Sequence, residues 1–309
     1  MARRRLVAVL QQEAVDGQTL FHGYDDAGRR LPIIPRDTAP IFFCGQSLFK
    51  LHPTFFDALV SILAQAPPSS VVVLVSPVDA AAPAATVPAA ATSTSTPLPT
   101  PTHSRQRQRR HPWIEMVYDR LRHAVAARYN MSDDDRPPSE AASRRMRDTL
   151  MQDVTRRVLV IPRTDRQTFL SHLSGATVVL DSFPFGGGVT SFQALSMGAP
   201  VVTLRHPSLW HGRITAAMYD AMGVPELARL LVAEDCVGYV TKAVALGGSL
   251  GERRGGRTGG HNLLLRRVRG LIHGASHRLF ENTTAITEWS AFLTRAARGQ
   301  RVAGGVRQS

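Results

Sequence analysis

Short apolar runs alternate with amphipathic segments along most of this chain. The runs 41–44, 71–75, 157–161, 176–180 and 200–204 are rich in β-branched or aromatic residues and have the length of buried strands. Strands that alternate with helices predict an α/β fold, in which helices cover both faces of a parallel sheet. The predicted helices cover residues 53–66, 113–128, 165–173, 190–198, 211–222, 237–246, 263–272 and 276–296, and the acidic stretch 131–145 is predicted to be a linker.

Two low-complexity stretches interrupt this alternation. Residues 80–111 are dominated by Ala, Pro, Ser and Thr and then by Arg and Gln, whereas residues 248–260 are rich in glycine. Neither composition buries enough apolar surface to offset the entropy of ordering, so both are predicted to be loop insertions. We therefore expect a poorly defined segment over 1–38, one α/β domain over 39–295 and a basic tail over 296–309.

The net charge of +13 comes from 37 basic and 24 acidic residues, and it is unevenly distributed. Fourteen arginines and one acid, Glu252, fall in the segments 1–5, 80–111, 248–260 and 295–309. The remainder holds 23 basic and 23 acidic residues, so the expected folded core is neutral. Nucleic-acid binding through these segments is the alternative, but the distribution favours solvated, arginine-biased loops over a nucleic-acid interface.

The remaining composition bears on compartment and metals. No apolar run reaches the roughly 18 residues that span a bilayer, and the N-terminal apolar stretch is too short for a signal peptide. Only two cysteines are present, Cys44 and Cys236, which favours a reducing compartment. We expect no membrane partner, no metal, and a cytoplasmic or nucleocytoplasmic location. The eleven histidines show no metal-ligand spacing.

The most informative segment is a glycine turn between a strand and a helix. The apolar run 176–180 precedes glycines 186–188, and Thr190 and Ser191 then begin an amphipathic segment. Glycines allow a ligand to approach the backbone, and a helix N-terminus favours an anion. The turn therefore predicts a phosphate site, although a tight strand–helix turn without a ligand fits the spacing equally well.

A second group of candidates lies at other strand-to-helix connections. Lys50 and Lys242 are the only lysines in a chain that otherwise uses arginine. Lys50 follows a predicted strand, where an ammonium could neutralise a diphosphate or simply be solvated. His52 could be a base, a phosphate donor or a helix cap. Arg213 could bind phosphate or be a solvated residue, and Trp210 could cover a base or a sugar.

Taken in order, several strings resemble the C-terminal catalytic region of the O-linked N-acetylglucosamine transferase and SPINDLY family. The similarity covers roughly residues 40–295, apart from the two insertions. Several motifs in the same order are more specific than any one of them. The strings are 46–53, 180–188, 194–203, 212–215 and 222–223.

This resemblance implies that residues 39–295 are a nucleotide-sugar-binding domain, the C-terminal, Rossmann-like half of a GT-B glycosyltransferase. It implies metal-independent transfer, with inversion, of a sugar to Ser or Thr hydroxyls of a protein acceptor. The donor is expected to be UDP-N-acetylglucosamine, with GDP-fucose as the alternative, and no cofactor is expected. The resemblance makes Lys50 the catalytic contact to the donor diphosphate. The expected nucleotide-sugar-binding residues are Gln46, Ser47, Arg166, Gly186, Gly187, Gly188, Val189, Thr190, Ser191, Gln193 and Arg213.

The sequence also departs from the family pattern. Val189 stands where relatives carry Asn or Thr, Gly188 stands where animal members carry His, and Gln193 stands where an acid is usual. The chain has no room for the facing N-terminal domain, so a separate chain is a candidate partner that supplies it. The alternative is a non-catalytic nucleotide-binding or interaction module, or a truncated fragment.

Overall fold

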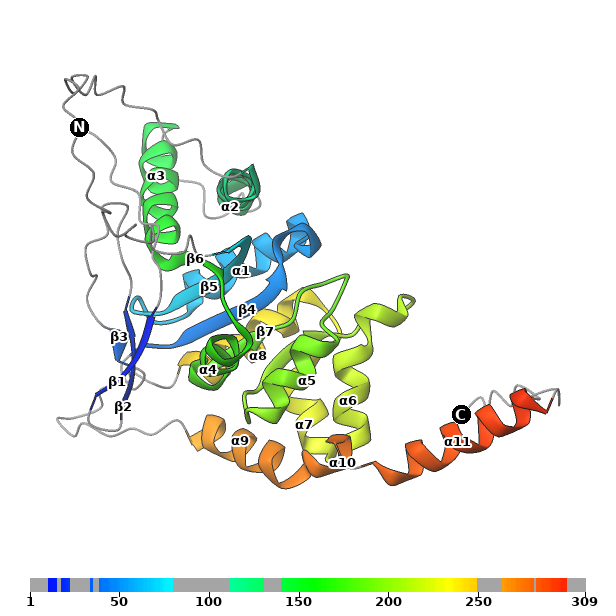
Figure 1. The fold of residues 1–309 in the computed structure, drawn as a ribbon. Helices are drawn as coiled ribbons and strands as arrows, with labels where there is room; N and C mark the ends of the chain where they lie inside the picture. Colours follow the sequence, from blue (N-terminus) through cyan, green and yellow to red (C-terminus); the bar gives the residue numbers. More distant parts are fainter. Residues whose placement is uncertain are drawn as a thin grey trace, which may run out of the picture.

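A parallel six-stranded sheet forms the centre of the protein (Figure 1). The computed structural model describes residues 11–15, 18–22, 34–35, 39–79, 112–130, 140–248, 263–280 and 282–298. Across the sheet the strand order is β6-β5-β4-β7-β8-β9, and every neighbouring pair is parallel. The strands are β4 (Ile41–Ser47), β5 (Val71–Asp79), β6 (Val158–Arg163), β7 (Val178–Leu180), β8 (Val201–Leu204) and β9 (Val232–Ala233).

Helices connect the strands and cover the sheet on both faces (Figure 1). This is the α/β fold that the alternating pattern predicts. The α-helices are α1 (Pro53–Gln65), α2 (Pro112–Asn130), α3 (Glu140–Arg157), α4 (Arg166–Gly175), α5 (Val189–Ser196), α6 (Ile214–Met222), α7 (Pro225–Leu231), α8 (Cys236–Gly247), α9 (Leu263–Ala275), α10 (His277–Phe280) and α11 (Thr283–Ala297). Two short 3-10 helices, η1 (Leu48–Lys50) and η2 (Trp210–Gly212), follow β4 and β8.

Strand β4 shows why the central strands are apolar throughout. Successive side chains of a strand point to opposite faces of the sheet. Phe42 lies against Gly247 of α8, whereas Phe43 packs on Phe169 of α4 with ring centroids 5.9 Å apart. Both phenylalanines are buried, so neither face of β4 meets water. A strand covered on both sides needs a continuous apolar run rather than alternation.

Helix α1 is fixed at both ends by hydrogen bonds. Pro53 occupies its first turn, where a proline has no helical N–H to lose, and His52 Nδ1 accepts a hydrogen bond from the Thr54 N–H at 3.4 Å. At the other end, the buried guanidinium of Arg157 donates to the Leu63 carbonyl at 2.8 Å. That last contact joins the end of α1 to the residue that precedes β6.

Four parts of the structure differ from the sequence-based expectations. Helix α3 begins at Glu140, so the prediction of a linker over 131–145 is wrong for its last residues. Helix α7 and strand β9 were not predicted. Residues within 1–38 form a three-stranded antiparallel sheet, where no pattern was recognised. Its strands are β1 (Gln11–Val15), β2 (Gln18–His22) and β3 (Ile34–Pro35).

Some expectations concern residues that lie outside the described ones. The predicted insertions over 80–111 and 249–260, and most of the expected tail from residue 299 onward, belong to this group. Within the described residues, no helix combines the length and the apolar character needed to cross a bilayer.

Candidate functional site

The strand order identifies one place in the sheet where a ligand is expected. From β4 the chain moves outward through β5 to β6, returns to the centre, and then moves the other way from β7 through β8 to β9. This is the doubly wound order of a Rossmann-like fold, and ligands of such sheets lie beyond the carboxyl ends of the two central strands. Here those strands are β4 and β7, which end at Ser47 and Leu180.

Lys50 lies at this place. It is the last residue of η1, which directly follows β4, and its Nζ donates to Gln46 Oε1 at 3.3 Å. The same ammonium lies 4.6 Å from the ring centroid of Phe185, which comes from the segment after β7. The two segments predicted to bind the diphosphate therefore meet on the same side of the sheet.

The glycine turn packs closely against the β4 side chains. A Cβ added to Gly187 would lie 2.5 Å from Gln46 Nε2 and 2.6 Å from Ser191 Oγ, so a side chain there would displace the ends of these two side chains. Gly188, by contrast, has open space where a Cβ would be. Gln46 is 5% exposed, and it contacts Lys50 through its oxygen and the turn through its nitrogen. We call Gln46, Lys50 and residues 186–191 the switch-point site.

Helix α5 begins inside this site. Its N-cap residue is Gly188, which has no side chain to satisfy the amide groups of the first turn. The first N–H groups of a helix lack partners within the helix, and they carry the positive end of its dipole. Val189, the first residue of α5, is 73% exposed, so this end of the helix is accessible. The geometry suits an anion placed between the helix end and the Lys50 ammonium.

A buried carboxylate holds the turn in shape. Asp181 follows β7, is 2% exposed, and accepts the Gly187 N–H at Oδ1 over 2.5 Å. Its Oδ2 accepts the hydroxyls of Thr203 at 2.8 Å and Thr215 at 2.7 Å. Because the Thr215 hydrogen goes to Asp181, the Ser191 hydroxyl donates to Thr215, 2.8 Å away. The carboxylate thus connects the turn, β8, α6 and the start of α5.

Burial changes the acidity of this carboxyl group. Loss of solvation raises the pKa of Asp181 to about 6, against the opposing effects of its three hydrogen-bond donors and of the Lys50 charge. At neutral pH the group is therefore mostly ionised and accepts all three hydrogen bonds. The protonation of Asp181 can therefore be followed in a titration around pH 6.

Aromatic residues of α8 and η2 pack against the segment that leads into the turn. Phe183 is buried and packs edge-on against Tyr239 of α8, with centroids 5.1 Å apart. The Tyr239 hydroxyl donates to the main-chain oxygen of Asp181 at 2.9 Å. Phe185 stacks on His211 of η2 at 4.6 Å, and the Gly186 N–H donates to the His211 carbonyl at 3.2 Å. The segment after β8 therefore also borders the site.

The structure places the other predicted residues less closely. Ser47 is exposed at the end of β4, and Gln193 is half-buried within α5. Arg213 is exposed and precedes α6, two residues after His211. Arg166 is exposed at the start of α4, beyond β6, and β5 and β4 lie between that strand and β7. The roles of these residues in binding stay predictions.

The structure also bears on His52, on metal binding and on Trp210. His52 caps α1 through Thr54, which was one of the three readings of that residue. Across the part of the chain that the structure describes, no group of three or more His, Cys, Asp or Glu side chains could hold a metal ion. Trp210 is 74% exposed and contacts His211 edge-on at 5.7 Å, next to the switch-point site.

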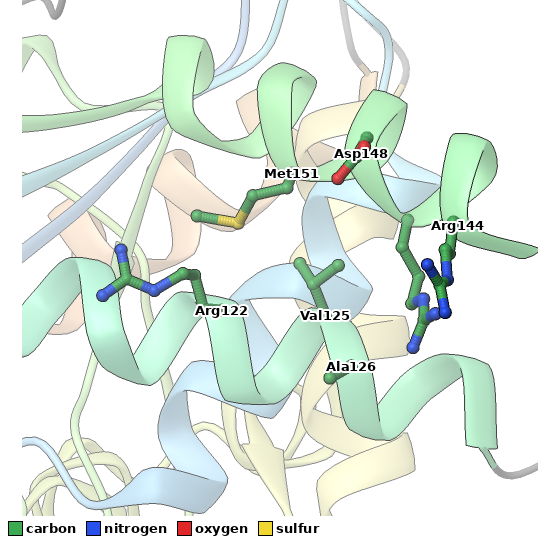
Figure 2. Close-up of a pocket in the computed structure, with 7 residues that line it drawn as sticks. Arg122, Val125, Ala126, Arg144, Asp148 and Met151 are labelled. Carbon is green, nitrogen blue, oxygen red and sulfur yellow. The ribbon is translucent and has the colours of Figure 1, made fainter.

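A separate cavity of about 310 Å³ lies between α2 and α3 (Figure 2). It lies on the helices that connect β5 to β6, and one of its arginines, Arg122, already forms an ion pair with Asp119. The chemistry described above is not found in its lining. We therefore locate the candidate site from the topology and the contacts around Lys50. The residues labelled in the cavity are Arg122, Val125, Ala126, Arg144, Asp148 and Met151.

Three residues that support the switch-point site through Asp181 were not among the sequence-based candidates. Thr203, Thr215 and Tyr239 lie far from the glycine turn in the sequence and reach Asp181 only through the fold. Thr203 is a polar residue inside the apolar run 200–204, which is the one signal that could have singled it out. For Tyr239 the sequence offers no such signal.

The fold defines a Rossmann-like α/β protein, and a glycine-rich strand–helix turn lies at its topological switch point. No family model matches the chain, and no curated protein matches it. Among solved structures, the chain is similar to a mutant of the O-GlcNAc transferase from Thermobaculum terrenum, at 19% identity and a TM-score of 0.46. That alignment covers 79% of this chain and 35% of the other, so the chain spans about a third of that transferase.

Proposed function

We propose that this protein is the donor-binding half of a glycosyltransferase that uses a nucleotide-activated sugar. One observation carries the proposal: at the carboxyl ends of β4 and β7 the Lys50 ammonium contacts Phe185 and Gln46, and Gln46 borders Gly187 of the turn that leads into α5. A nucleoside diphosphate is the leaving group of glycosyl transfer, and it gains negative charge in the transition state. An ammonium and a helix N-terminus fixed in advance stabilise that charge.

Within this proposal, each part of the switch-point site has a task. The Lys50 ammonium neutralises the diphosphate, and the N–H groups at the start of α5 donate to its oxygens. Thr190, half-buried in the first turn of α5, adds a hydroxyl donor. Gln46 holds the Lys50 ammonium, and Asp181 fixes the Gly187 amide. The proposed reaction is metal-independent transfer with inversion to a Ser or Thr hydroxyl of a protein.

The proposed donor is UDP-N-acetylglucosamine, and GDP-fucose is the alternative. Both follow from the sequence resemblance, which includes SPINDLY-type proteins. The switch-point site itself recognises the diphosphate that the two donors share. Base and sugar are expected to be read by neighbouring residues, among which Arg166 and Gln193 are the candidates from the sequence.

A second candidate function is a nucleotide-binding module without transferase activity. It is favoured because the candidate acid–base groups near the site already form hydrogen bonds within the protein. Asp181 is buried and accepts three hydrogen bonds, and His52 caps α1. A transferase needs a group that removes the acceptor proton. In the first proposal, a separate chain that faces the site supplies this group and the acceptor surface.

Calorimetry with inorganic pyrophosphate, UDP, GDP and the two sugar nucleotides tests the diphosphate assignment. Lys50→Ala removes a charge-assisted contact of about 1.5–3 kcal/mol, so it should weaken binding by roughly tenfold to a hundredfold. The matched control is Lys242→Ala, which removes the only other lysine. Unchanged affinity in Lys50→Ala would exclude the proposed site. Binding without transfer to protein acceptors would favour the non-catalytic module.

A further inference from the structure

The glycine turn of the switch-point site is built on a buried acid. Asp181 Oδ1 accepts the Gly187 N–H, and a Cβ added to Gly186 would lie 3.1 Å from Asp181 Oδ2. Burial raises the pKa of this carboxyl group, and the Lys50 charge acts in the opposite direction. An anion bound between Lys50 and the start of α5 therefore comes close to a second negative charge. Two like charges in a site of low dielectric disfavour each other.

The other titratable side chains around Asp181 are held in their neutral forms. Burial raises the pKa of the Cys44 thiol on β4 to about 12. Burial also raises the pKa values of the hydroxyls of Tyr219 on α6 and Tyr239 on α8, from an ordinary value that is already high. These three groups therefore keep their protons between pH 5 and pH 8, whereas Asp181 changes charge in that range.

Lys50 is the charged side chain that acts on Asp181 from a neighbouring element. Arg205, which follows β8, pairs with two surface carboxylates instead, and Arg213, which precedes α6, is exposed. From η2, the His211 main-chain carbonyl accepts a hydrogen bond from the turn, and its imidazole stacks on an aromatic ring of the segment that leads into the turn. The charge balance beneath the turn is thus set mainly by Lys50 and Asp181.

The hydrogen-bond network also has an arrangement that accommodates a proton on Asp181. Thr215 Oγ1 lies 2.7 Å from Asp181 Oδ2 and 3.4 Å from the Gly187 carbonyl oxygen. A protonated Oδ2 can donate to Thr215 Oγ1, while the Thr215 hydrogen turns to the Gly187 carbonyl. The Gly187 N–H keeps its acceptor at Oδ1, and Thr203 can still donate to Oδ2. Protonation therefore removes a negative charge and leaves the turn in place.

We propose that binding of a diphosphate at the switch-point site is coupled to uptake of up to one proton, which Asp181 takes from the solvent. This inference rests on the proposed function, because it concerns the same anion site. The bound anion disfavours the carboxylate below it, and the proton removes that repulsion. Linkage makes the effect reciprocal, so the affinity for diphosphate rises as the pH falls. Asp181 is then a positioning residue of the Gly187 amide whose charge also regulates anion affinity.

Calorimetry with inorganic pyrophosphate, in two buffers of different ionisation enthalpy, counts the protons taken up on binding. If the anion raises the midpoint of Asp181 by about one pH unit, the parent should take up about half a proton more than Asp181→Asn at pH 6.5. Pyrophosphate takes up protons of its own, and the comparison of the two proteins cancels them. Because the amide has no charge, Asp181→Asn should bind pyrophosphate up to about tenfold more tightly at pH 7.5. The matched control, Asp220→Asn, removes a surface carboxylate and should keep the proton count and affinity of the parent.

A second measurement needs no substitution at Asp181 and reports on the acid directly. The nitrogen-15 and proton shifts of the Gly187 amide should titrate with a midpoint near pH 6 in the free protein. Saturation with pyrophosphate should raise this midpoint by about one pH unit. Equal proton counts for parent and Asp181→Asn, or an unchanged Gly187 midpoint, would overturn the inference and leave the diphosphate site intact. Absence of pyrophosphate binding by the parent at every pH would instead overturn the proposed function, and the inference with it.

Discussion

The two ends of the central sheet each hold a buried ionisable group, and the two groups are held very differently. At the amino end, before β6, the Arg157 guanidinium donates to the carbonyls of Leu63, Ser70 and Pro67 at 2.8–2.9 Å and pairs with Asp153. At the carboxyl end, Asp181 accepts three donors from the turn, β8 and α6. Arg157 joins structural segments, whereas Asp181 shapes a turn that has an accessible helix end beside it.

The difference indicates that the amino edge of the sheet contributes to stability, whereas the candidate binding residues lie at the carboxyl edge. The Arg157 contacts are nearly all main-chain carbonyls, which need a permanent donor and offer nothing to a ligand. The Asp181 contacts hold the turn beside the half-buried Lys50 and the exposed first residue of α5, Val189. Substitutions at the amino end should therefore change stability alone, and substitutions at the carboxyl end should change ligand binding as well.

The largest expected effect is that of Arg157→Ala. Removal of the guanidinium takes one donor from each of three carbonyls, of which the Pro67 carbonyl keeps the Ser70 N–H, and loss of one member of a buried charged network costs about 3–5 kcal/mol. Urea unfolding should show this loss as a lower midpoint. Nucleotide affinity, measured at a temperature where the variant is folded, should equal that of the parent. A selective loss of affinity would contradict the assignment of Arg157 to stability.

Asp181→Asn should change how stability depends on pH. The pKa of Asp181 is raised from 3.8 to about 6 in the folded protein, so the native state binds more protons between these values. The stabilisation from this group is complete below pH 4 and is lost as the pH rises through about 6, a change of about 3 kcal/mol. Between pH 4 and pH 7 the unfolding free energy of the parent should therefore fall by this amount relative to that of the variant.

A control for this pH experiment is the exposed Asp220. Its carboxylate lies 3.6 Å from Arg205 on the surface, where an ion pair contributes little. Asp220→Asn should therefore keep the slope of the parent protein between pH 4 and pH 7. If Asp181→Asn also keeps it, another group is responsible for the pH dependence.

Gly187→Ala should have a smaller effect on stability and a clear effect on the site. The new Cβ would meet Gln46 Nε2 and Ser191 Oγ at 2.5 and 2.6 Å, so these two buried side chains have to shift. Overpacking of this kind costs about 1–3 kcal/mol. Gly188→Ala, with open space at that position, should cost less than 1 kcal/mol. Equal unfolding midpoints for the two variants would show that the close contact at Gly187 does not constrain the turn.

The sequence predicts the sheet well because its strands are buried on both faces. Apolar runs such as 71–75 and 200–204 have no other stable place than the inside of a parallel sheet, and they correspond to β5 and β8. The meeting of Lys50 with the glycine turn follows from the same rule, since the carboxyl ends of parallel strands lie at one edge. The strand pairing itself, β4 beside β7, is visible only in the structure.

Other elements were missed for identifiable reasons. Strand β9 has two residues, which are too few for a periodic pattern. Helix α3 is rich in arginine and buries few residues, such as Val154, so its apolar periodicity is weak. The pairing of β1 with β2 does have a local signal in the sequence. Asp16 and Gly17 lie between Val15 and Gln18, which pair directly, and Asp-Gly is a strong hairpin sequence.

The hydroxyl of Tyr239 has a consequence for the point during synthesis at which the glycine turn can be complete. It holds the main chain at Asp181 from a position 58 residues further along the sequence. While the chain is being synthesised, the glycine turn leaves the ribosome well before the helix that completes its support. A nascent chain that ends before residue 239 therefore lacks one of the contacts that fix the turn. Co-translational ligand capture at this turn would have to wait for α8.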